Sequence, residues 1–258
     1  MEYNSEEYKK DNYKLEKILG RGAEGTTYRA IDLINNREVA IKIVNINSIP
    51  EMIGWKSIYE GEVYALSILS GDNICSKYAP CLYDYFITEE GFWIVMQLIQ
   101  GEILDDIIIR FEDDLDNGIS NIELRWIMIG KLLEAYSYIN SKGIQHRDIT
   151  QNNIIWNAEN IVFIDFGFAC NSLTDDCQKR KFGKYPDLKY LILVIDIIAN
   201  DNIKSAYDWK ELNFDKKYQR YVEFWDEDRA TRLASITSDR SESSLDVIIQ
   251  KYTGLIDN

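Results

Sequence analysis

Two short apolar segments in the middle of the chain, each next to a cluster of polar residues, constrain the fold most. The segment Ile161–Ile164 runs into Asp165, and twelve residues before that aspartate Asn153 opens the segment Asn153–Trp156. If the two segments are neighbouring strands, Asp165 and Asn153 place two hard oxygen ligands at their ends, which suits Mg²⁺ together with substrate phosphates. Asp148, five residues before Asn153, can then orient a hydroxyl group and accept its proton. Either segment alone would more simply begin a turn.

A lysine lies inside an otherwise apolar run that is typical of a strand. Lys42 ends the sequence Val39-Ala40-Ile41-Lys42, and a buried ammonium group needs a partner because desolvation without one is costly. The run Ile58–Leu69 has apolar residues at helical spacing and carries Glu60 and Glu62 in its first half. Glu62 fits best, four residues before Leu66 on the apolar stripe. Both glutamates would otherwise belong to an ordinary solvated helix face.

Gly20, Gly22 and Gly25 form a glycine-rich turn between two strand-like runs. Such a turn also occurs in ordinary hairpins and in dinucleotide-binding folds, where a helix follows the third glycine. Here Thr26 and Thr27 follow it, and their β-branched side chains favour a strand. The turn then becomes a flap whose backbone N–H groups can lie over phosphates. On this motif alone, an ordinary hairpin remains an equal alternative.

Turn residues divide the first part of the chain into strand-like runs, and helical spacing dominates later. We expect strands at Leu15–Leu19, Thr26–Asp32, Glu38–Val44, Leu82–Thr88, Phe92–Leu98, Asn153–Trp156 and Ile161–Ile164. We expect helices at Ile58–Leu69, from Ser120 to a stop at Gly143, and, after about Pro186, at Tyr207–Leu212, Asp215–Arg229 and Leu245–Ile256. The chain is therefore β-rich at its start and α-rich afterwards.

Composition excludes several classes of function. Lys and Arg number 29 against 43 Asp and Glu, which gives a formal charge of −14. Such a surface repels phosphate backbones and anionic lipids, so we expect neither nucleic-acid nor membrane binding. No apolar run approaches the roughly 18 residues of a membrane span. His146 is the single histidine, so a metal site built from several histidines is impossible.

The four cysteines fall into two pairs, Cys75 with Cys81 and Cys170 with Cys177. Neither spacing is that of a zinc knuckle, and four cysteines in 258 residues do not make a disulfide scaffold. The first residues, Met1–Lys10, also lack the basic-then-apolar order of a signal peptide. We therefore expect reduced thiols in an intracellular, soluble protein.

Taken in order, these motifs resemble those of the eukaryotic-type protein kinases: a glycine loop, a strand lysine, His146-Arg147-Asp148 and Asp165-Phe166-Gly167. The likeness is continuous from about Leu15 to Ala169. It implies an α+β, bilobal protein-kinase-like fold in a single domain, residues 1–258. The β-rich N-lobe would be residues 13–97, and a reduced, mostly helical C-lobe with a short activation segment would be residues 98–258.

The resemblance also implies roles in the transfer of the γ-phosphoryl group of ATP. Lys42, held by Glu62, grips the α- and β-phosphates, Asp165 and Asn153 hold Mg²⁺, and Asp148 acts on the acceptor hydroxyl. Ala40 and Ile155 would sandwich the adenine behind a Met96 gatekeeper, while the backbone of Gln97 and Leu98 hydrogen-bonds its edge, and His146 is structural. The residues implied around the nucleotide are Leu19, Gly20, Arg21, Gly22, Ala23, Glu24, Gly25, Thr26, Thr27, Ala40, Lys42, Glu62, Gln97, Leu98 and Ile155.

Two departures from the family pattern stand out. Thr150 and Gln151 occupy the positions of the usual lysine and proline after the catalytic aspartate. The small KEOPS-complex kinases resemble this chain in having threonine at the position of Thr150, but they have glycine where this chain has Arg147. Losing a cation beside the transferred phosphate should slow transfer or narrow the acceptor range.

The second departure is that no Ala-Pro-Glu follows Asp-Phe-Gly before Asp187, which takes the place of the buried aspartate of the family's central C-lobe helix. The short segment between them contains Lys179-Arg180-Lys181, either a solvated loop or an acceptor-recognition patch.

The resemblance predicts an ATP- and Mg²⁺-dependent protein kinase acting on Ser or Thr hydroxyls of a protein acceptor. A pseudokinase-like nucleotide-binding scaffold is the alternative that Thr150 and the missing peptide platform favour. A kinase of a small-molecule hydroxyl is a third, because such enzymes also dispense with a long activation segment. The glycine flap argues against that third hypothesis.

Overall fold

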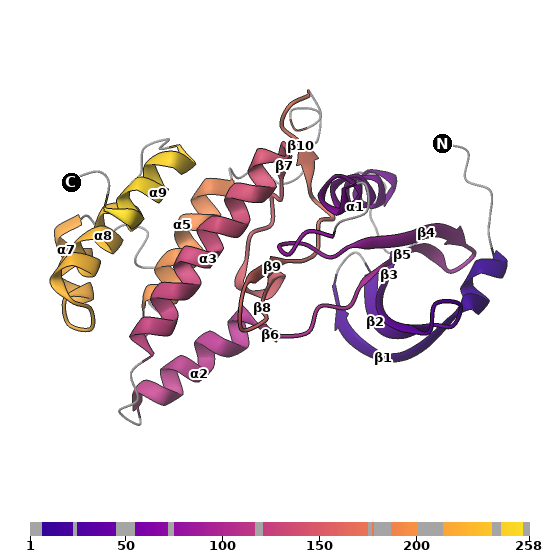
Figure 1. Ribbon diagram of the computed structural model, residues 1–258, viewed down its shortest axis with the longest axis horizontal. Coiled ribbons are helices and arrows are strands. Elements are labelled where there is room, and N and C mark those ends of the chain that lie inside the picture. Colours follow the sequence, from indigo (N-terminus) through magenta and orange to yellow (C-terminus); the bar gives the residue numbers. More distant parts are fainter. Residues whose placement is uncertain are drawn as a thin grey trace. The chain divides into compact units, whose positions relative to one another are not determined.

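The computed structural model describes residues 7–22, 25–44, 55–71, 75–116, 121–174, 177, 187–200, 214–238 and 244–254. Ala23 and Glu24 of the glycine turn, the basic stretch 179–181 and the predicted helix at 207–212 lie outside these ranges. The chain divides into two compact units (Figure 1). The first comprises residues 1–101, 139–148 and 162–184, and the second comprises residues 102–138, 149–161 and 185–258.

An antiparallel sheet forms the body of the first unit. Its strands are β1 (Tyr13–Arg21), β2 (Gly25–Asp32), β3 (Arg37–Val44), β4 (Leu82–Thr88) and β5 (Gly91–Gln97), in the order β1-β2-β3-β5-β4. The five strands predicted for this region are confirmed, with shifts at their ends, and Glu89-Glu90 lies in the predicted hairpin turn. The β-rich start of the chain is therefore a single twisted sheet.

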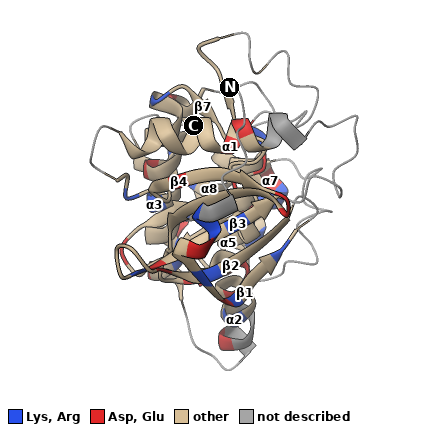
Figure 2. Ribbon diagram, turned by 90° about the vertical axis from the view of Figure 1, so that its right-hand side faces the viewer, with Lys and Arg blue, Asp and Glu red and all other residues tan. Residues whose placement is uncertain are grey.

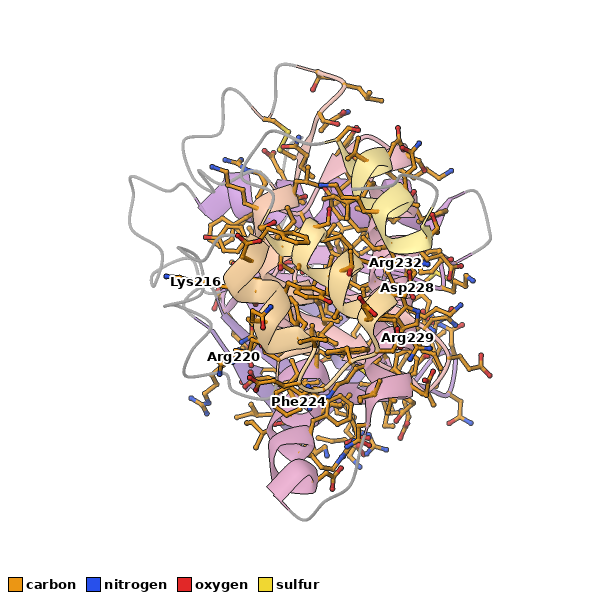
Figure 3. The ribbon with its side chains drawn as sticks, turned by 90° about the vertical axis from the view of Figure 1, so that its left-hand side faces the viewer. Lys216, Arg220, Phe224, Asp228, Arg229 and Arg232 are labelled. Atoms are coloured by element: carbon orange, nitrogen blue, oxygen red, sulfur yellow. A yellow bond between two sulfur atoms is a disulfide. The ribbon has the colours of Figure 1, made fainter. Side chains whose placement is uncertain are left out.

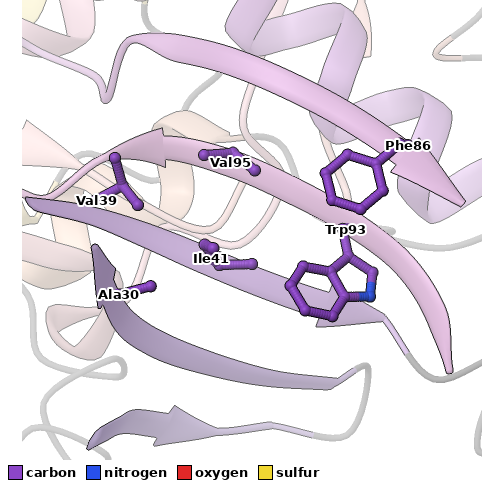
Figure 4. Close-up of a cluster of buried hydrophobic side chains, with 6 residues drawn as sticks. All are labelled: Ala30, Val39, Ile41, Phe86, Trp93 and Val95. Atoms are coloured by element: carbon purple, nitrogen blue, oxygen red, sulfur yellow. The ribbon is translucent and has the colours of Figure 1, made fainter. Parts of the chain in front are cut away.

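The two faces of this sheet bury different side chains. On one face Ala30, Val39, Ile41, Phe86, Trp93 and Val95 form a cluster in which no residue is more than 4% exposed (Figure 4). Successive residues of a strand point to opposite faces, so Lys42 and Phe92 belong to the other face. Helix α1 (Trp55–Ser70) packs there, with the Tyr59 and Phe92 ring centroids 4.3 Å apart. The pleat thus directs Lys42 toward the helix that carries Glu62.

Charged residues of both signs are distributed along the strands of this sheet (Figure 2). Arg29 of β2 contacts Glu38 and Glu16, and Arg37 contacts Asp32 at 3.1 Å. A short 3₁₀ helix, η1 (Glu7–Asn12), lies against β4, where Lys9 and Asp84 approach to 3.6 Å. The described part of the sheet therefore presents mixed charge rather than one sign.

Disulfides join both cysteine pairs, so the expectation of reduced thiols is wrong. Cys75 bonds Cys81 in the connection between α1 and β4, and Cys170 bonds Cys177 after Asp165. Sequence separation alone does not show whether two cysteines can approach; the backbone must bring their Cα atoms within about 7 Å. Here the fold turns the chain back on itself within six or seven residues at both places.

Short strands complete the first unit. β7 (Ile144–Gln145) pairs antiparallel with β10 (Cys170–Asn171). The preceding turn at Gly143 has a φ of 72°, which a glycine adopts without strain and which stops helix α3 (Ile122–Ser141) where the sequence predicted it. β9 (Ile161–Phe163) leads into Asp165, and its Phe163 N–H donates to the carbonyl of Tyr78 in the Cys75–Cys81 loop at 2.9 Å.

The second unit is mainly helical. β6 (Glu102–Ile103) pairs with β8 (Ile154–Trp156), and η2 (Gln151–Asn153) precedes β8. The helices are α2 (Leu104–Asp116), most of α3, α5 (Asp187–Ala199), α7 (Phe214–Tyr221), α8 (Glu227–Thr237) and α9 (Leu245–Thr253). The long predicted helix over α3 is confirmed. No helix in the described ranges is long and apolar enough to cross a bilayer.

One predicted helix, Asp215–Arg229, is instead two. α7 ends at Tyr221, and Asp226 starts α8 by accepting a hydrogen bond from the backbone N–H of Arg229 at 2.9 Å. Between them the Trp225 indole donates to the Ala199 carbonyl at 3.1 Å, which holds the turn against α5. Helix α9 ends at Thr253 because Gly254 adopts a left-handed cap.

An ion pair lies inside the second unit. Lys217 of α7 contacts Asp196 of α5 at 2.9 Å and the Thr237 carbonyl of α8 at 2.8 Å, and both charged side chains are under 5% exposed. Tyr221 also donates to Asp196. Burial raises the pKa of Asp196 in spite of the Lys217 ammonium. Nearer the surface, Arg229 and Arg232 project from α8 (Figure 3) toward Glu123 and Asp228.

Candidate active site

Lys42 lies between two carboxylates that come from distant parts of the chain. Its ammonium group is 2.8 Å from Oε2 of Glu62 on α1 and 2.5 Å from Oδ1 of Asp165 after β9. The side chains of Lys42 and Glu62 are 7% and 1% exposed. The predicted contact between Lys42 and Glu62 is therefore confirmed, and Glu62 rather than Glu60 makes it. The buried cation has the partners that its burial demands.

Asp165 differs from Glu62 in being open to solvent. Its side chain is 42% exposed, and its backbone has a φ of 60°, a left-handed conformation that an aspartate adopts infrequently. Partial desolvation opposes ionisation, but the nearby Lys42 ammonium and a hydrogen bond from the Gly167 backbone lower the pKa of Asp165 below its usual value. The carboxylate is thus anionic at neutral pH and accessible, as a ligand of a divalent cation must be.

His146 is a core residue beside this carboxylate. It is fully buried, its Nε2 lies 3.0 Å from the Ile164 carbonyl, and its Nδ1 lies 3.3 Å from the backbone N–H of Asp148. This pattern fits the tautomer with the proton on Nε2. The imidazole also packs on Phe166, with ring centroids 4.6 Å apart. The predicted structural environment of His146 is confirmed, and it ties the Asp148 loop to the Asp165 segment.

The backbone around Asp148 is strained. Arg147 has a φ of 66° and is buried, and Asp148, which follows it, is half-buried. Non-glycine residues in this region cost free energy and cluster at functional sites. Arg147 follows His146 in sequence, and the His146 imidazole packs on Phe166, the residue after Asp165. The two left-handed residues, Arg147 and Asp165, therefore each adjoin one partner of this ring contact.

The glycine-rich turn joins β1 to β2. The Gly22 N–H donates to the Gly25 carbonyl at 2.9 Å. A Cβ on Gly25 would lie 2.2 Å from the Ile43 carbonyl oxygen, whereas one on Gly20 or Gly22 would meet open space. Thr26 and Thr27 continue directly into β2. Because a strand rather than a helix follows the third glycine, the dinucleotide-binding alternative is excluded.

The end of β5 holds the residues predicted to bind adenine from the first unit. Ala40 and Met96 are cross-strand partners on β3 and β5, each 7% exposed. The Gln97 N–H donates to the Cys81 carbonyl at 2.9 Å. Leu98 follows the strand and is half-buried. The sequence did not predict that the N–H of Gln97 is already used.

The remaining predicted residues belong to the second unit. Asn153 ends η2, with its N–H donating to the Thr150 carbonyl at 3.0 Å, and Ile155 pairs with Ile103 across β6 and β8. Thr150 precedes η2 in an extended conformation and makes no side-chain capping bond. The first unit therefore brings Lys42, Glu62 and Asp165 together, and the convergence of Asn153 and Ile155 on them stays a prediction.

Asp187 is the first residue of α5 and is 3% exposed, so its predicted burial is confirmed. Tyr136 of α3 is hydrogen-bonded to the Asp187 carboxylate. Burial and this carboxylate raise the pKa of the Tyr136 phenol. The residues around the site that sequence reasoning missed are Cys170, Cys177 and their neighbour Asn171. The pairing of the cysteines in the sequence was visible, but it was assigned to reduced thiols.

Comparison with known proteins agrees with this arrangement. The family described as "Protein kinase domain" matches residues 13–185. The serine/threonine-protein kinase PAK 1 of Mus musculus is 31% identical over 173 residues, 67% of this chain and 28% of that protein. Serine/threonine-protein kinase pak-1 of Caenorhabditis elegans is 31% identical over 65% of this chain and 26% of its own length.

A bacterial relative, serine/threonine-protein kinase D of Synechocystis, is 34% identical over 61% of this chain and 30% of its own length. The chain thus spans less than a third of each of these relatives. The family match covers more than half of the chain, from the start of β1 through the glycine turn, Lys42, Asp148 and Asp165. On these grounds the chain belongs to the protein kinase family.

Proposed function

We propose that this protein is an ATP- and Mg²⁺-dependent kinase that transfers the γ-phosphoryl group to a Ser or Thr hydroxyl of a protein acceptor. The observation that carries the proposal is the position of Lys42, held by the buried Glu62 and in contact with the exposed Asp165. An ion pair with a purely structural role would need only one carboxylate, and that carboxylate could be fully buried. A second, solvent-accessible carboxylate on the same ammonium group suits a site that receives a charged ligand.

The donor set fits Mg²⁺. Asp165 offers an ionised, accessible carboxylate and Asn153 an amide oxygen, the hard ligands that this ion prefers. Bound Mg²⁺ neutralises charge on the β- and γ-phosphates during transfer. Lys42 would bind the α- and β-phosphates, with Glu62 fixing its position. The glycine turn, residues Leu19–Thr27, would cover the phosphates with backbone N–H groups.

The adenine site is proposed on the same basis. Ala40, next to Met96, would contact one face of the ring and Ile155 the other, while the Gln97 carbonyl and the Leu98 backbone meet its edge. These assignments imply the lobes predicted above, residues 13–97 and 98–258, in one domain. In the transfer step the acceptor oxygen bonds to the γ-phosphorus, its proton passes to Asp148, and ADP leaves.

A nucleotide-binding scaffold is the second candidate. Thr150 replaces the lysine that family members place beside the γ-phosphate, and no Ala-Pro-Glu follows Asp165. A site that keeps Lys42, Glu62 and Asp165 can bind nucleotide without transferring phosphate at a useful rate. Retention of Asp148 favours the enzyme, because a scaffold has no use for a proton acceptor.

The test is incubation of the protein with labelled ATP, Mg²⁺ and a generic basic protein acceptor, with Asp148→Asn as the matched control. We expect label on the acceptor with the wild-type chain and a large loss with the variant, which keeps the size of the side chain but not its charge. Nucleotide binding without label transfer would favour the scaffold. Transfer to sugars or amines but not to peptides would favour a small-molecule kinase.

A further inference from the structure

The chain that follows Asp165 is closed into a loop by the disulfide between Cys170 and Cys177. Cys170 lies in β10, five residues after Asp165, and is 1% exposed. Cys177 is half-buried, so it is the more exposed of the two cysteines. The bond therefore connects Cys177 to the short strand β10 of the first unit.

β10 is attached to the strand that leads into the catalytic loop. It pairs with β7, with Cys170 opposite Gln145, and β7 runs directly into His146. The Ser172 N–H and hydroxyl both reach the Gly143 carbonyl, at 2.8 and 3.1 Å. A Cβ on Gly143 would lie 2.6 Å from the Leu173 side chain, so the chain after β10 packs closely over this turn.

The same strand is attached to the helix that holds Lys42. The Asn171 side-chain amide donates to the Tyr64 hydroxyl on α1, and α1 and β10 are in contact. Tyr64 is two residues from Glu62 on that helix. β10 thus links the two parts of the site in the first unit, the Lys42–Glu62 pair and the His146–Asp148 loop.

We propose that Cys170 and Cys177 form a redox modification site, at which thiol–disulfide exchange with a dithiol controls the rate of phosphoryl transfer. The disulfide form is the faster one. A strand of two residues gains little from its own ladder, and the bond lowers the conformational entropy that β10 must lose to stay paired. When the bond is reduced, β10 leaves β7 and α1 more often, and both parts of the site lose a support. The proposal rests on the proposed kinase function for its rate readout.

The chemistry is a two-step exchange. A thiolate of the dithiol attacks Sγ of Cys177 and forms a mixed disulfide with it, while the Cys170 sulfur leaves as a thiolate and is protonated. The second thiol of the reagent then attacks the reagent sulfur of this mixed disulfide, closes the reagent's own disulfide and releases Cys177 as a thiolate, which is protonated. Two electrons and two protons pass from the dithiol to the cysteine pair. A small-molecule disulfide such as oxidised glutathione reverses the reaction by the same steps.

The test uses the fact that the chain has four cysteines. In the variant Cys75→Ser/Cys81→Ala, the single disulfide left is Cys170–Cys177, so dithiothreitol acts there alone. We expect its kcat to fall by about 10- to 100-fold on reduction, the size of effect that a misplaced reacting group produces. Oxidised glutathione should restore the rate. In the matched variant that carries Cys170→Ala and Cys177→Ser in addition to these two substitutions, no cysteine is left, and we expect a low rate that dithiothreitol does not change.

A second readout does not depend on activity. Amide hydrogen exchange of the peptides containing Gly143–Gln145 and Cys170–Ser172 should quicken on reduction of the first variant, because the β7–β10 pairing opens more often. An unchanged rate and unchanged exchange, with reduction verified by thiol counting, would overturn the inference and make the bond a passive one. So would equal sensitivity to dithiothreitol in the variant without Cys170 and Cys177.

The two proposals fail differently. If the oxidised protein binds nucleotide and transfers no phosphate to any acceptor, the proposed function falls and control of transfer falls with it. If the oxidised protein transfers phosphate and the reduced protein does so equally fast, the redox inference alone falls. If the variant without Cys170 and Cys177 does not fold, the Cys75→Ser/Cys81→Ala variant still decides the outcome.

Discussion

Replacing Lys42 by methionine tests the site most directly, because the substitution keeps the length of the side chain and removes its charge. In the structure the ammonium group contacts Glu62, whose side chain is 1% exposed, and Asp165, whose side chain is 42% exposed. Removing one partner of a buried ion pair costs about 3 to 5 kcal/mol, because the other charge stays buried without compensation. The exposed Asp165 adds little to this because solvent screens it. We expect Lys42→Met to lower the free energy of unfolding by about that amount at neutral pH.

The substitution should also lower kcat by about 100- to 1,000-fold, the effect of losing one charged group that stabilises a transition state. Chemical denaturation followed by circular dichroism measures the stability, and labelled ATP measures the rate. The matched control is Lys42→Met/Glu62→Gln, in which no buried carboxylate is left. We expect the control to recover most of the stability and none of the activity, which separates phosphate binding from packing.

The pH dependence follows from Asp165. Lys42 lowers the pKa of this carboxyl, so the stability that the contact contributes is present above the ordinary value of 3.8 and is lost as pH falls through the folded value. The part of the stability difference between wild type and Lys42→Met that the Asp165 contact contributes should therefore disappear below about pH 4, a small decrease because solvent screens this contact. A difference that stayed constant from pH 7 to pH 3, or a double variant no more stable than Lys42→Met, would refute the reasoning.

Three further predictions concern other parts of the fold. Burial and, next, the Asp84 carboxylate raise the pKa of Tyr13 from 10.0 to about 12. The stability that the protonated Tyr13 phenol contributes to the folded state is therefore present below pH 10 and is lost as the pH rises toward 12. The difference in absorbance at high pH between wild type and Tyr13→Phe should show no phenolate at pH 10.5 while the protein stays folded. Gly25→Ala puts a Cβ 2.2 Å from the β3 backbone and should cost about 1 to 3 kcal/mol of unfolding free energy, whereas Gly22→Ala, in open space, should cost less. Lys217→Met leaves the buried Asp196 without its opposite charge and should cost about 3 to 5 kcal/mol, and Lys217→Met/Asp196→Leu should regain most of it. Thermal melts of the wild type and the two variants measure this, and a different order of stability would contradict the assignment.

The sheet of the first unit was predictable because its signals are local. Strand runs alternate with turn residues such as Asn35-Asn36 and Glu89-Glu90-Gly91, and side chains of one face repeat every second residue. Physical chemistry also predicted the partner of Lys42, because a buried cation demands a carboxylate and the next helix offered one on its apolar stripe. The predictions thus held where neighbouring residues determine the outcome.

Helix α2 shows a local signal that was overlooked. Leu104, Ile107, Ile108 and Phe111 recur at helical spacing, and all are at most 2% exposed. The run Ile107–Ile109 and the aspartates around it are poor helix formers, which hides the periodicity. The buried stripe outweighs these preferences, because most of a helix's stability in a protein comes from packing.

The site itself depends on what no local pattern reports. Lys42 and Asp165 are 123 residues apart, and their contact requires a left-handed backbone at Asp165, which a sequence pattern favours for glycine or asparagine before aspartate. The cysteine pairs show the same limit, since only the fold determines whether two Cα atoms come within bonding range. These two features also meet in one place: the Asp165 segment continues into β10, and the disulfide closes the chain just after it. Residue types alone therefore predicted that Lys42 needs a carboxylate partner. They did not predict how the chain holds Asp165 in position.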